Sequence, residues 1–433
     1  MAKAKIVTNT LYQLLAKIIS TFSTLLITIL ITRWLGAGTW GDYAIASSYI
    51  GFFYVFTEFG INSIAVKHFS ERGIISISEF LNFFVIRFLY TVVVIAIAFS
   101  ILPLFNYSPN ILNALHLMFF ALLFFSISSS FNSIYQTKFL YKYLFYSTFL
   151  LGVVNLSVFV FTVFVLNEKT LPFLAISLVL AELSRVILSI FLSYSQLEKD
   201  SKLSFDKKLF SLFIKSSIPL GVAIGFNTLM TQVDKLMLSV MVSNKEVGFY
   251  ALSYKLFDIA LVLPTFFMNA VFPTLVSKFS DLKSYNTIYS KSYVYLGVFS
   301  VILTIFALAL APLFIPFIWG SEMVPAILSF QILVLGSIFF YLSSPVSWVY
   351  VIENRQQVLI YFYFLGFLFN YLSNLYAISN FGFLGAAITT GLTELLILVM
   401  LEMYRVKYLK TRFYYQKAPL YIKQLFTQIK SVI

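Results

Sequence analysis

The feature of this sequence that most constrains its fold is a series of long apolar stretches separated by short connections. The 433-residue chain reads as twelve such stretches. They are placed at 10–32, 43–66, 80–102, 113–135, 144–166, 171–193, 215–241, 248–276, 292–315, 324–350, 358–378 and 382–404. A helix that crosses the hydrocarbon core of a bilayer needs roughly 20 apolar residues. The pattern predicts an all-α integral membrane protein with about twelve transmembrane helices.

The distribution of Lys and Arg predicts which connections lie on which side of the membrane. Of the 30 cations, 22 lie at the two ends or in even-numbered connections, 3 lie in odd-numbered connections, and 5 lie inside the spans. Connections rich in Lys and Arg stay in the cytoplasm. Both termini and the 194–214 connection are therefore expected there. The net charge of +13 follows the same distribution, so we interpret it as topology and attraction to anionic lipid rather than nucleic-acid binding.

Composition and motifs argue against enzyme chemistry. The chain has no Cys and only two His, His68 and His116, which excludes disulfides, thiolate ligands and a histidine metal site. The GxGxxG match at 36–41 follows a predicted membrane helix rather than a strand, so it does not predict a dinucleotide site. No connection exceeds about 20 residues, which leaves no room for an extramembrane catalytic domain. We expect no metal, no cofactor and no enzymatic activity.

Short internal matches indicate that the chain repeats one plan. Residues 41–44 match 248–251, residues 66–71 match 276–281, and residues 180–183 match 392–395, at offsets of 207, 210 and 212. Chance similarity among apolar segments is the alternative. Because each half has six spans, the two copies enter the membrane from the same side. Such copies form two six-helix bundles related by a pseudo-two-fold axis along the membrane normal, a plan common in transporters.

The repeat predicts two bundles and a C-terminal tail. The first bundle is assigned to 1–200, the second to 201–404, and the basic tail to 405–433. The apolar positions Ile422, Leu425, Phe426 and Ile429 fall on one helical face, with Lys423 and Lys430 among the polar positions. Such a helix is expected to lie on the cytoplasmic leaflet. A disordered tail is the alternative.

Charged side chains inside the spans are the candidates for a functional site. An ionisable group in hydrocarbon costs at least roughly 2.5–3.5 kcal/mol, so it normally faces water or a partner. The substrate-binding candidates are Lys17, Arg87, Arg185, Lys235 and Lys255. Several cations in one wet cavity suit a phosphate or diphosphate, which Arg binds bidentately and Lys binds as a point charge. Structural ion pairs, or snorkelling to an interface, are the alternative.

The anions inside the spans are candidates for ion coupling. These candidates are Asp234, Glu394, Glu58 and Asp258. Two pairs of opposite charges stand three residues apart, a spacing that allows an ion pair on one helix face. The pairs are Glu182 with Arg185 and Lys255 with Asp258. Asp234 and Lys235 are adjacent, so their side chains diverge toward different partners. Asp234 or Glu394 could take up and release a proton, and a structural pair with another helix is the alternative.

Several short segments resemble one family. They are 32–36, 41–44 and 58–60 in the first half, and 234–235, 246–250 and 255–256 in the second. These segments resemble the first helical hairpin of Wzx-type polysaccharide and O-antigen flippases. That family belongs to the multidrug/oligosaccharidyl-lipid/polysaccharide exporter superfamily, which also holds multidrug/toxin extrusion proteins and lipid II flippases. The resemblance covers the whole chain in span number and repeat, and twelve spans argue against the fourteen-span lipid II branch.

The resemblance implies a function in surface polysaccharide biosynthesis. It implies alternating access that moves undecaprenyl-diphosphate-linked oligosaccharide outward across a bacterial-type cytoplasmic (inner) membrane. Lys17, Lys235 and Lys255 are then expected to face a shared water-filled cavity between the halves. Partners would be the lipid-linked glycan, membrane lipids, and the polymerase and glycosyltransferases of the same pathway. Coupling to H⁺ or Na⁺ is left open. The alternatives are a cation-coupled multidrug exporter and a membrane polysaccharide polymerase or ligase.

Overall fold

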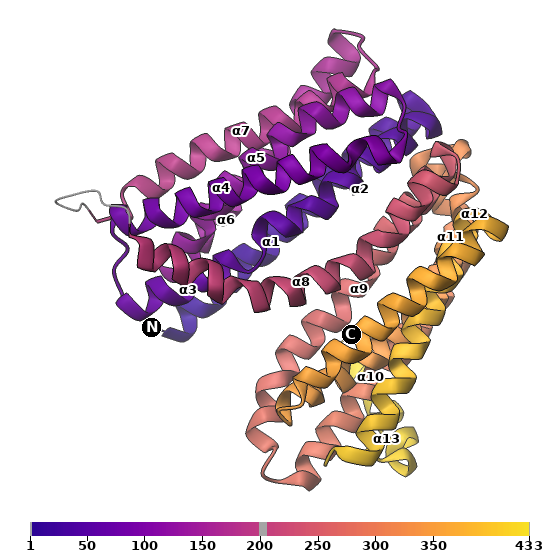
Figure 1. Cartoon of the computed structure of the whole chain (residues 1–433). Coiled ribbons are helices and arrows are strands. Elements are labelled where there is room, and N and C mark those ends of the chain that lie inside the picture. The colour runs from indigo at the N-terminus through magenta and orange to yellow at the C-terminus, as the bar shows by residue number, and fades with distance from the viewer. Residues whose placement is uncertain (1, 199–205, 433) are drawn as a thin grey trace. The chain divides into compact units, whose positions relative to one another are not determined.

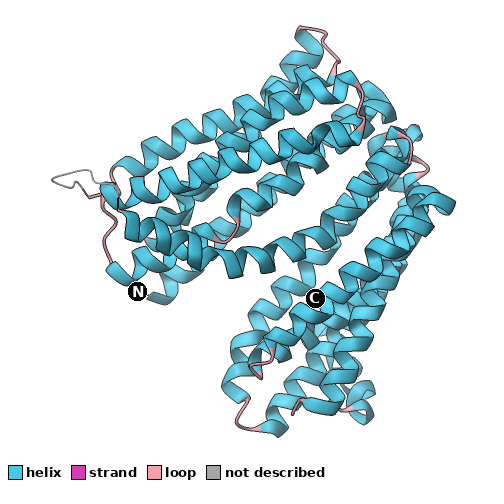
Figure 2. Cartoon of the chain, viewed as in Figure 1, coloured by secondary structure: helices cyan, strands magenta, loops and turns pink. Residues whose placement is uncertain are grey.

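The predicted all-α architecture is confirmed. The computed structural model describes residues 2–198 and 206–432, and the regular elements among them are helices (Figures 1 and 2). By the packing of its helices the chain divides into two compact units, Met1–Gln232 and Val233–Ile433. This division falls inside one long helix, α8 (Lys207–Met241). The repeat boundary at 200–201 that the sequence suggests lies before that helix and stays a prediction.

The helices match the predicted spans closely. The first unit contains α1 (Ala2–Leu30), α2 (Gly36–Glu58), α3 (Ile61–Arg72), α4 (Ile77–Ile101), α5 (Pro109–Thr137), α6 (Tyr141–Val160), α7 (Leu171–Tyr194) and most of α8. The second unit contains the end of α8, α9 (Asn244–Lys278), α10 (Leu282–Trp319), α11 (Ala326–Ile352), α12 (Gln356–Tyr408) and α13 (Ala418–Val432). Short π-helical turns, Ile31–Leu35 and Phe161–Val165, follow α1 and α6.

Capping residues explain several of the helix ends. The side chains of Ser76 and Ser108 accept hydrogen bonds from the first turns of α4 and α5. Ser243 and Glu246 form a reciprocal capping box at the start of α9. These contacts satisfy amide groups that the first turn of a helix leaves without partners. At the end of α3 the chain turns at Gly73, whose φ of +74° suits glycine.

The first two spans form a helical hairpin that turns at Gly36, where φ is +85°. α1 runs in the same direction as α6, and α2 runs in the same direction as α5, because the contacts within each pair follow the same order along both helices. These contacts are Tyr12 with Phe145 (5.8 Å between ring centroids), Trp34 with Phe164 (5.7 Å), Asp42 with Asn110 (3.4 Å) and Glu58 with Ser129. Since α5 and α6 are joined by a short reversal at 138–140, α1 and α2 run in opposite directions.

α12 also contains two spans. Its backbone leaves the helical region at Gly382, where φ is +56° and ψ is −141°. Thr389 Oγ1 donates a hydrogen bond to the side chain of Asn374. In a straight helix these two residues would be roughly 22 Å apart, at about 1.5 Å per residue. The chain therefore doubles back at Gly382, and the arms before and after it are separate membrane spans.

Counting these hairpins recovers the predicted twelve spans. The described residues contain nine helices that are long and apolar enough to cross a membrane. Two of them, Leu11–Arg72 and Gln356–Tyr408, are the hairpins just described and are 62 and 53 residues long. α8, which is 35 residues long and contains the predicted span 215–241, is long enough to supply the remaining one. The protein is thus a multi-pass membrane protein.

The two units repeat one packing pattern internally. In the first unit α5 packs on α2, α4 and α7. In the second unit α11 packs on α9, α10 and α12. Gly336 of α11 and Gly391 of α12 meet backbone to backbone, because a Cβ built on Gly336 would lie 2.8 Å from the Cα of Gly391. Small residues allow such close approach between membrane helices.

The tail is tied to the second unit before it forms α13. The amides of Lys410 and Thr411 donate to Glu353 at 2.8 and 3.0 Å, and the Arg412 amide donates to Asn286 at 2.8 Å. Tyr421 of α13 is 2% exposed. α13 packs on α10. The structure therefore contains a helix where the amphipathic pattern predicts one, and its placement on the cytoplasmic leaflet stays a prediction.

Candidate functional site

In the first unit, Arg87 is neutralised by an anion on another helix. Its Nη2 donates to Glu58 Oε1 at 2.8 Å, and its Nε donates to Ser126 at 3.3 Å. Ser129 also donates to Glu58. The Arg87 side chain is 1% exposed, whereas the Glu58 side chain is 35% exposed. This arrangement matches the structural-pair alternative for Arg87.

Arg185 belongs to the same cluster. Its Nη1 lies 3.6 Å from Glu182 Oε2, one helical turn away on α7. The charge of Arg185 also acts on Glu58, and its guanidinium lies 5.8 Å from the centroid of the Phe125 ring. The spacing in the sequence predicted the pair with Glu182. We call Glu58, Arg87, Glu182 and Arg185 the first charge cluster, and its two cations and two anions balance.

Lys17 lies on α1 of the first unit, and its side chain is exposed. Lys235 and Lys255 belong to the second unit. The expectation that these three cations share one cavity therefore stays a prediction.

The second unit brings together the other cations. Lys235 Nζ, on α8, lies 4.2 Å from the centroid of the Tyr254 ring on α9, the distance of a cation–π contact. The charge of Lys255 interacts with those of Lys235 and Asp258, and Asp258 also interacts with Lys235. We call Lys235, Tyr254, Lys255 and Asp258 the second charge cluster.

Asp234 points to different partners from its neighbour Lys235, as their adjacency predicted. Its carboxylate is 1% exposed and accepts three hydrogen bonds from uncharged side chains. Tyr250 donates at 2.9 Å, Thr390 at 2.8 Å and Asn374 at 2.7 Å. The carboxylate thus joins α8, α9 and both arms of α12. Hydrogen bonds to an ionised carboxylate are worth about 1.5–3 kcal/mol each.

The hydrogen-bond network continues beyond these donors. Asn374 Nδ2 also donates to Asn370 Oδ1 at 3.1 Å, and Thr389 donates to Asn374. Oxygen atoms of carboxylate, amide and hydroxyl groups therefore gather around Asp234. Such oxygens can bind a proton or a hard cation. We call this group the Asp234 network, formed by Asp234, Tyr250, Asn370, Asn374, Thr389 and Thr390.

Glu394 lies one helical turn beyond Thr390 on the second arm of α12. Its charge acts on Tyr254 of the second charge cluster and on Tyr363. Lys235 thus contacts the Tyr254 ring, and the charges of Asp234, Asp258 and Glu394 act on the same side chain.

Sequence reasoning missed the uncharged members of the Asp234 network. Asn370 and Asn374 stand four residues apart inside an apolar span, a spacing that places both amides on one helix face. Polar side chains inside a membrane helix seek partners on neighbouring helices. That pattern was a usable signal. The pairing of Asn374 with Asp234, 140 residues away, required the fold.

These features define the class of the protein. It is a multi-pass all-α membrane protein of two helical units, with charged side chains held inside its spans. Such an arrangement is typical of transporters, in which intramembrane charge marks substrate and ion paths.

The comparisons identify the family. A family model described as "Polysaccharide biosynthesis protein" matches residues 6–279, and the chain belongs to this family. No curated protein matches significantly by sequence.

Solved structures share the fold at low sequence identity. The lipid II flippase MurJ in its inward closed conformation has a TM-score of 0.73 and 17% identity, covering 99% of this chain and 93% of that one. The MATE multidrug transporter DinF-BH has a TM-score of 0.65 and 15% identity, covering 94% and 95%. An inward-facing MATE family transporter of the MOP superfamily has a TM-score of 0.64 and 12% identity, covering 93% and 95%. The chain is thus a polysaccharide biosynthesis protein by family, and it shares the fold of these flippase and multidrug transporter structures.

Proposed function

We propose that the protein translocates a polyprenyl-diphosphate-linked oligosaccharide, of the undecaprenyl type, across the cytoplasmic membrane by alternating access. The observation that carries this proposal is the second charge cluster. Lys235 and Lys255 lie together with Tyr254 inside the spans of a polysaccharide biosynthesis protein. Both termini would lie in the cytoplasm, and the product would pass to the polymerase of the same pathway.

The chemistry of the second charge cluster suits a diphosphate bound to a sugar. Two ammonium groups can each donate hydrogen bonds to phosphate oxygens, and such charge-assisted bonds are about twice as strong as neutral ones. Tyr254 already holds Lys235 by its ring face. Lys17 would supply a further cation on α1 of the first unit. Arg87 and Arg185 would hold the first unit together through Glu58 and Glu182, and the binding of substrate by these two arginines stays a prediction.

We propose that Asp234 couples transport to an ion gradient. Its carboxylate bridges α8, α9 and both arms of α12, so a change in its charge would alter the packing of all four segments. A proton or a sodium ion could supply that change, because both bind carboxylate, amide and hydroxyl oxygens. Glu394 is the second coupling candidate, and Asp258 would offset the charge of one of the two lysines.

A cation-coupled multidrug exporter is the alternative function, since the multidrug transporter DinF-BH shares the fold. Cationic drugs need exposed carboxylates. Lys235 and Lys255 would repel such cargo, which favours an anionic head group.

The experiment is complementation of surface polysaccharide export in a flippase-deficient bacterial strain. Single Lys235→Ala and Lys255→Ala variants should lower surface polysaccharide at normal protein level in the membrane, and the Arg variants should restore part of it. Lys169→Ala, in a short connection between predicted spans, is the matched control. If both Ala variants export normally at normal level, the second charge cluster does not bind the substrate.

A further inference from the structure

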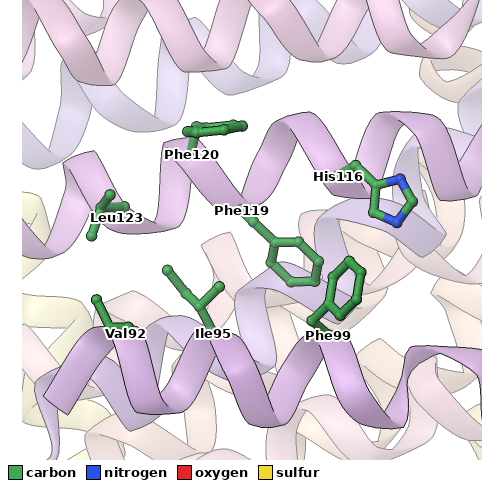
Figure 3. Close-up of a pocket in the computed structure, with 7 residues that line it drawn as sticks. All are labelled: Val92, Ile95, Phe99, His116, Phe119, Phe120 and Leu123. Carbon is green, nitrogen blue, oxygen red and sulfur yellow. The ribbon is translucent and has the colours of Figure 1, made fainter. Parts of the chain in front are cut away.

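The first unit contains an apolar groove between α4 and α5 with a volume of about 540 Å³. Val92, Ile95 and Phe99 line it from α4, and His116, Phe119, Phe120 and Leu123 line it from α5 (Figure 3). The ring centroid of Phe99 lies 5.5 Å from that of His116 and 6.1 Å from that of Phe119. Apart from His116, every side chain that lines this groove is apolar.

The second unit contains a corresponding groove. It has a volume of about 330 Å³ and lies among α9, α10 and α11. Five residues of the first groove have a counterpart in the second groove 211 positions further along the chain: Val92, Ile95, Phe99, Phe119 and Leu123. Phe119 and its counterpart Phe330 are both 6% exposed. The offset of 211 agrees with the sequence repeats at 207, 210 and 212. The groove is therefore a repeated feature of the fold rather than a local packing defect.

The lining of the second groove determines what it can bind. All of its lining side chains are apolar, and they lie within membrane-spanning helices. Binding there must come from burial of hydrocarbon, because the side chains offer no hydrogen-bond donors or acceptors. Both groove volumes fall in the range of roughly 300–1,000 Å³ that holds small ligands. A ligand of this groove would therefore be a hydrocarbon chain.

The second groove differs from the first because α9 supplies an additional wall. Leu256, Ile259, Ala260 and Leu263 of α9 line it. The same helix carries Lys255 of the second charge cluster. At 3.6 residues per turn, Ile259 stands one turn beyond Lys255 on nearly the same face. The groove and the second charge cluster are therefore neighbouring surfaces of one helix.

We propose that the second groove binds the isoprenoid chain of the lipid-linked substrate while the diphosphate lies at Lys235 and Lys255. The inference rests on the proposed function and adds to it a site for the tail. A single groove beside a cationic cluster matches a carrier with one chain per head group, whereas a membrane phospholipid has two chains. Phe306, Phe314 and Phe330 line the groove, and their flat rings suit the flat, methyl-branched double bonds of isoprene units.

Photo-crosslinking of the full-length protein in lipid nanodiscs tests this site. One probe is a polyprenyl diphosphate with a diazirine in an isoprene unit near the diphosphate. The other is a phosphatidylcholine with a diazirine in an acyl chain. We expect polyprenyl adducts on the segments 256–263 and 303–314, and we expect unlabelled polyprenyl diphosphate, but not phosphatidylglycerol, to remove them. Polyprenyl adducts that match the phosphatidylcholine adducts in position and competition would overturn the proposal.

Two alanines of α10 provide a matched pair of variants. Ala307 lines the second groove, whereas Ala309 is exposed two residues away and does not line it. Ala307→Phe should lower polyprenyl adduct yield and transport by roughly tenfold or more, since displacing even two buried methylene groups costs that much. Ala309→Phe should change adduct yield and transport by no more than about twofold, because Ala309 does not line the groove. Equal effects of the two variants would contradict the tail site.

The outcomes separate this inference from the proposed function. If the protein translocates the lipid-linked glycan but the adducts lie outside the second groove, the tail site is wrong and the function stands. If vesicles with the wild-type protein translocate no lipid-linked glycan, the proposed function fails. The adduct map of the wild-type protein remains decisive even where Ala307→Phe does not fold.

Discussion

Replacing either partner of the Arg87–Glu58 ion pair alone should reduce the stability of the protein. Replacing both partners together by apolar residues should restore much of the lost stability. Removing one partner of a buried ion pair costs about 3–5 kcal/mol, because an uncompensated charge is left behind. The loss of stability in Glu58→Leu should lie at the upper end of this range, because the Arg87 side chain that is left without its partner is 1% exposed. Arg87→Met should lie at the lower end, because Glu58 is 35% exposed and keeps the hydroxyl of Ser129.

The double variant provides the decisive comparison. Replacing both members of a buried pair by apolar residues is often neutral. Independent effects would add to roughly 8 kcal/mol, taking about 5 and 3 for the two single changes. We expect the double variant to lose several kcal/mol less stability than this sum.

The assay is thermal unfolding of the detergent-solubilised protein, followed by fluorescence-detected size exclusion, with membrane abundance measured in parallel. Arg87→Lys is the control that keeps the charge. A double variant as unstable as the sum of the single variants would refute the ion pair as a stabilising contact. Normal stability of Arg87→Met with loss of transport would instead assign Arg87 to the substrate.

The remaining predictions concern coupling, topology and the tail. Asp234→Asn should keep the hydrogen-bonded packing of the network but abolish the dependence of transport on an imposed H⁺ or Na⁺ gradient. Glu394→Gln is compared in the same vesicles. Unchanged gradient dependence in both variants would mean that neither carboxylate couples transport to an ion. Reporter fusions at Leu197 and Asn110 should report opposite sides of the membrane, and the same side for both would overturn the assignment of spans. Truncation at Tyr415 should leave export unchanged, because α13 lies beyond the segment that is hydrogen-bonded to Glu353; loss of export at normal membrane abundance would show that the tail is required.

Much of the fold followed from the sequence because a bilayer leaves few choices. Runs of apolar residues must become helices there, since each backbone amide needs a partner within its own segment. The predicted span 113–135 is α5 (Pro109–Thr137), and the predicted span 171–193 is α7 (Leu171–Tyr194). The spacing of three residues likewise predicted the ion pair between Glu182 and Arg185. Local spacing contained enough information for these features.

Contacts between distant segments could not be predicted in the same way. Glu58 and Arg87 are 29 residues apart, and Asp234 and Thr390 are 156 residues apart. An ionisable group inside a span requires a partner, but any polar side chain on any neighbouring helix can provide it. Which helices become neighbours depends on packing, such as the approach of Gly336 to Gly391. The sequence therefore identified Arg87 and Asp234 as candidates without identifying their partners.

The central claim is tested most directly by translocation in vesicles that contain only the purified protein. A fluorescent polyprenyl-diphosphate-linked oligosaccharide is placed in both leaflets, and the fraction that a membrane-impermeant glycosidase can reach is followed with time. The wild-type protein should make the whole pool accessible. Lys235→Ala and Lys255→Ala should each slow this by roughly tenfold or more, since a charge-assisted contact is worth about 1.5–3 kcal/mol, and the Lys→Arg variants should be slowed less. Wild-type vesicles whose inner pool stays protected, or Ala variants as fast as the wild-type protein, would contradict a lipid-linked glycan flippase that holds its substrate through these two lysines.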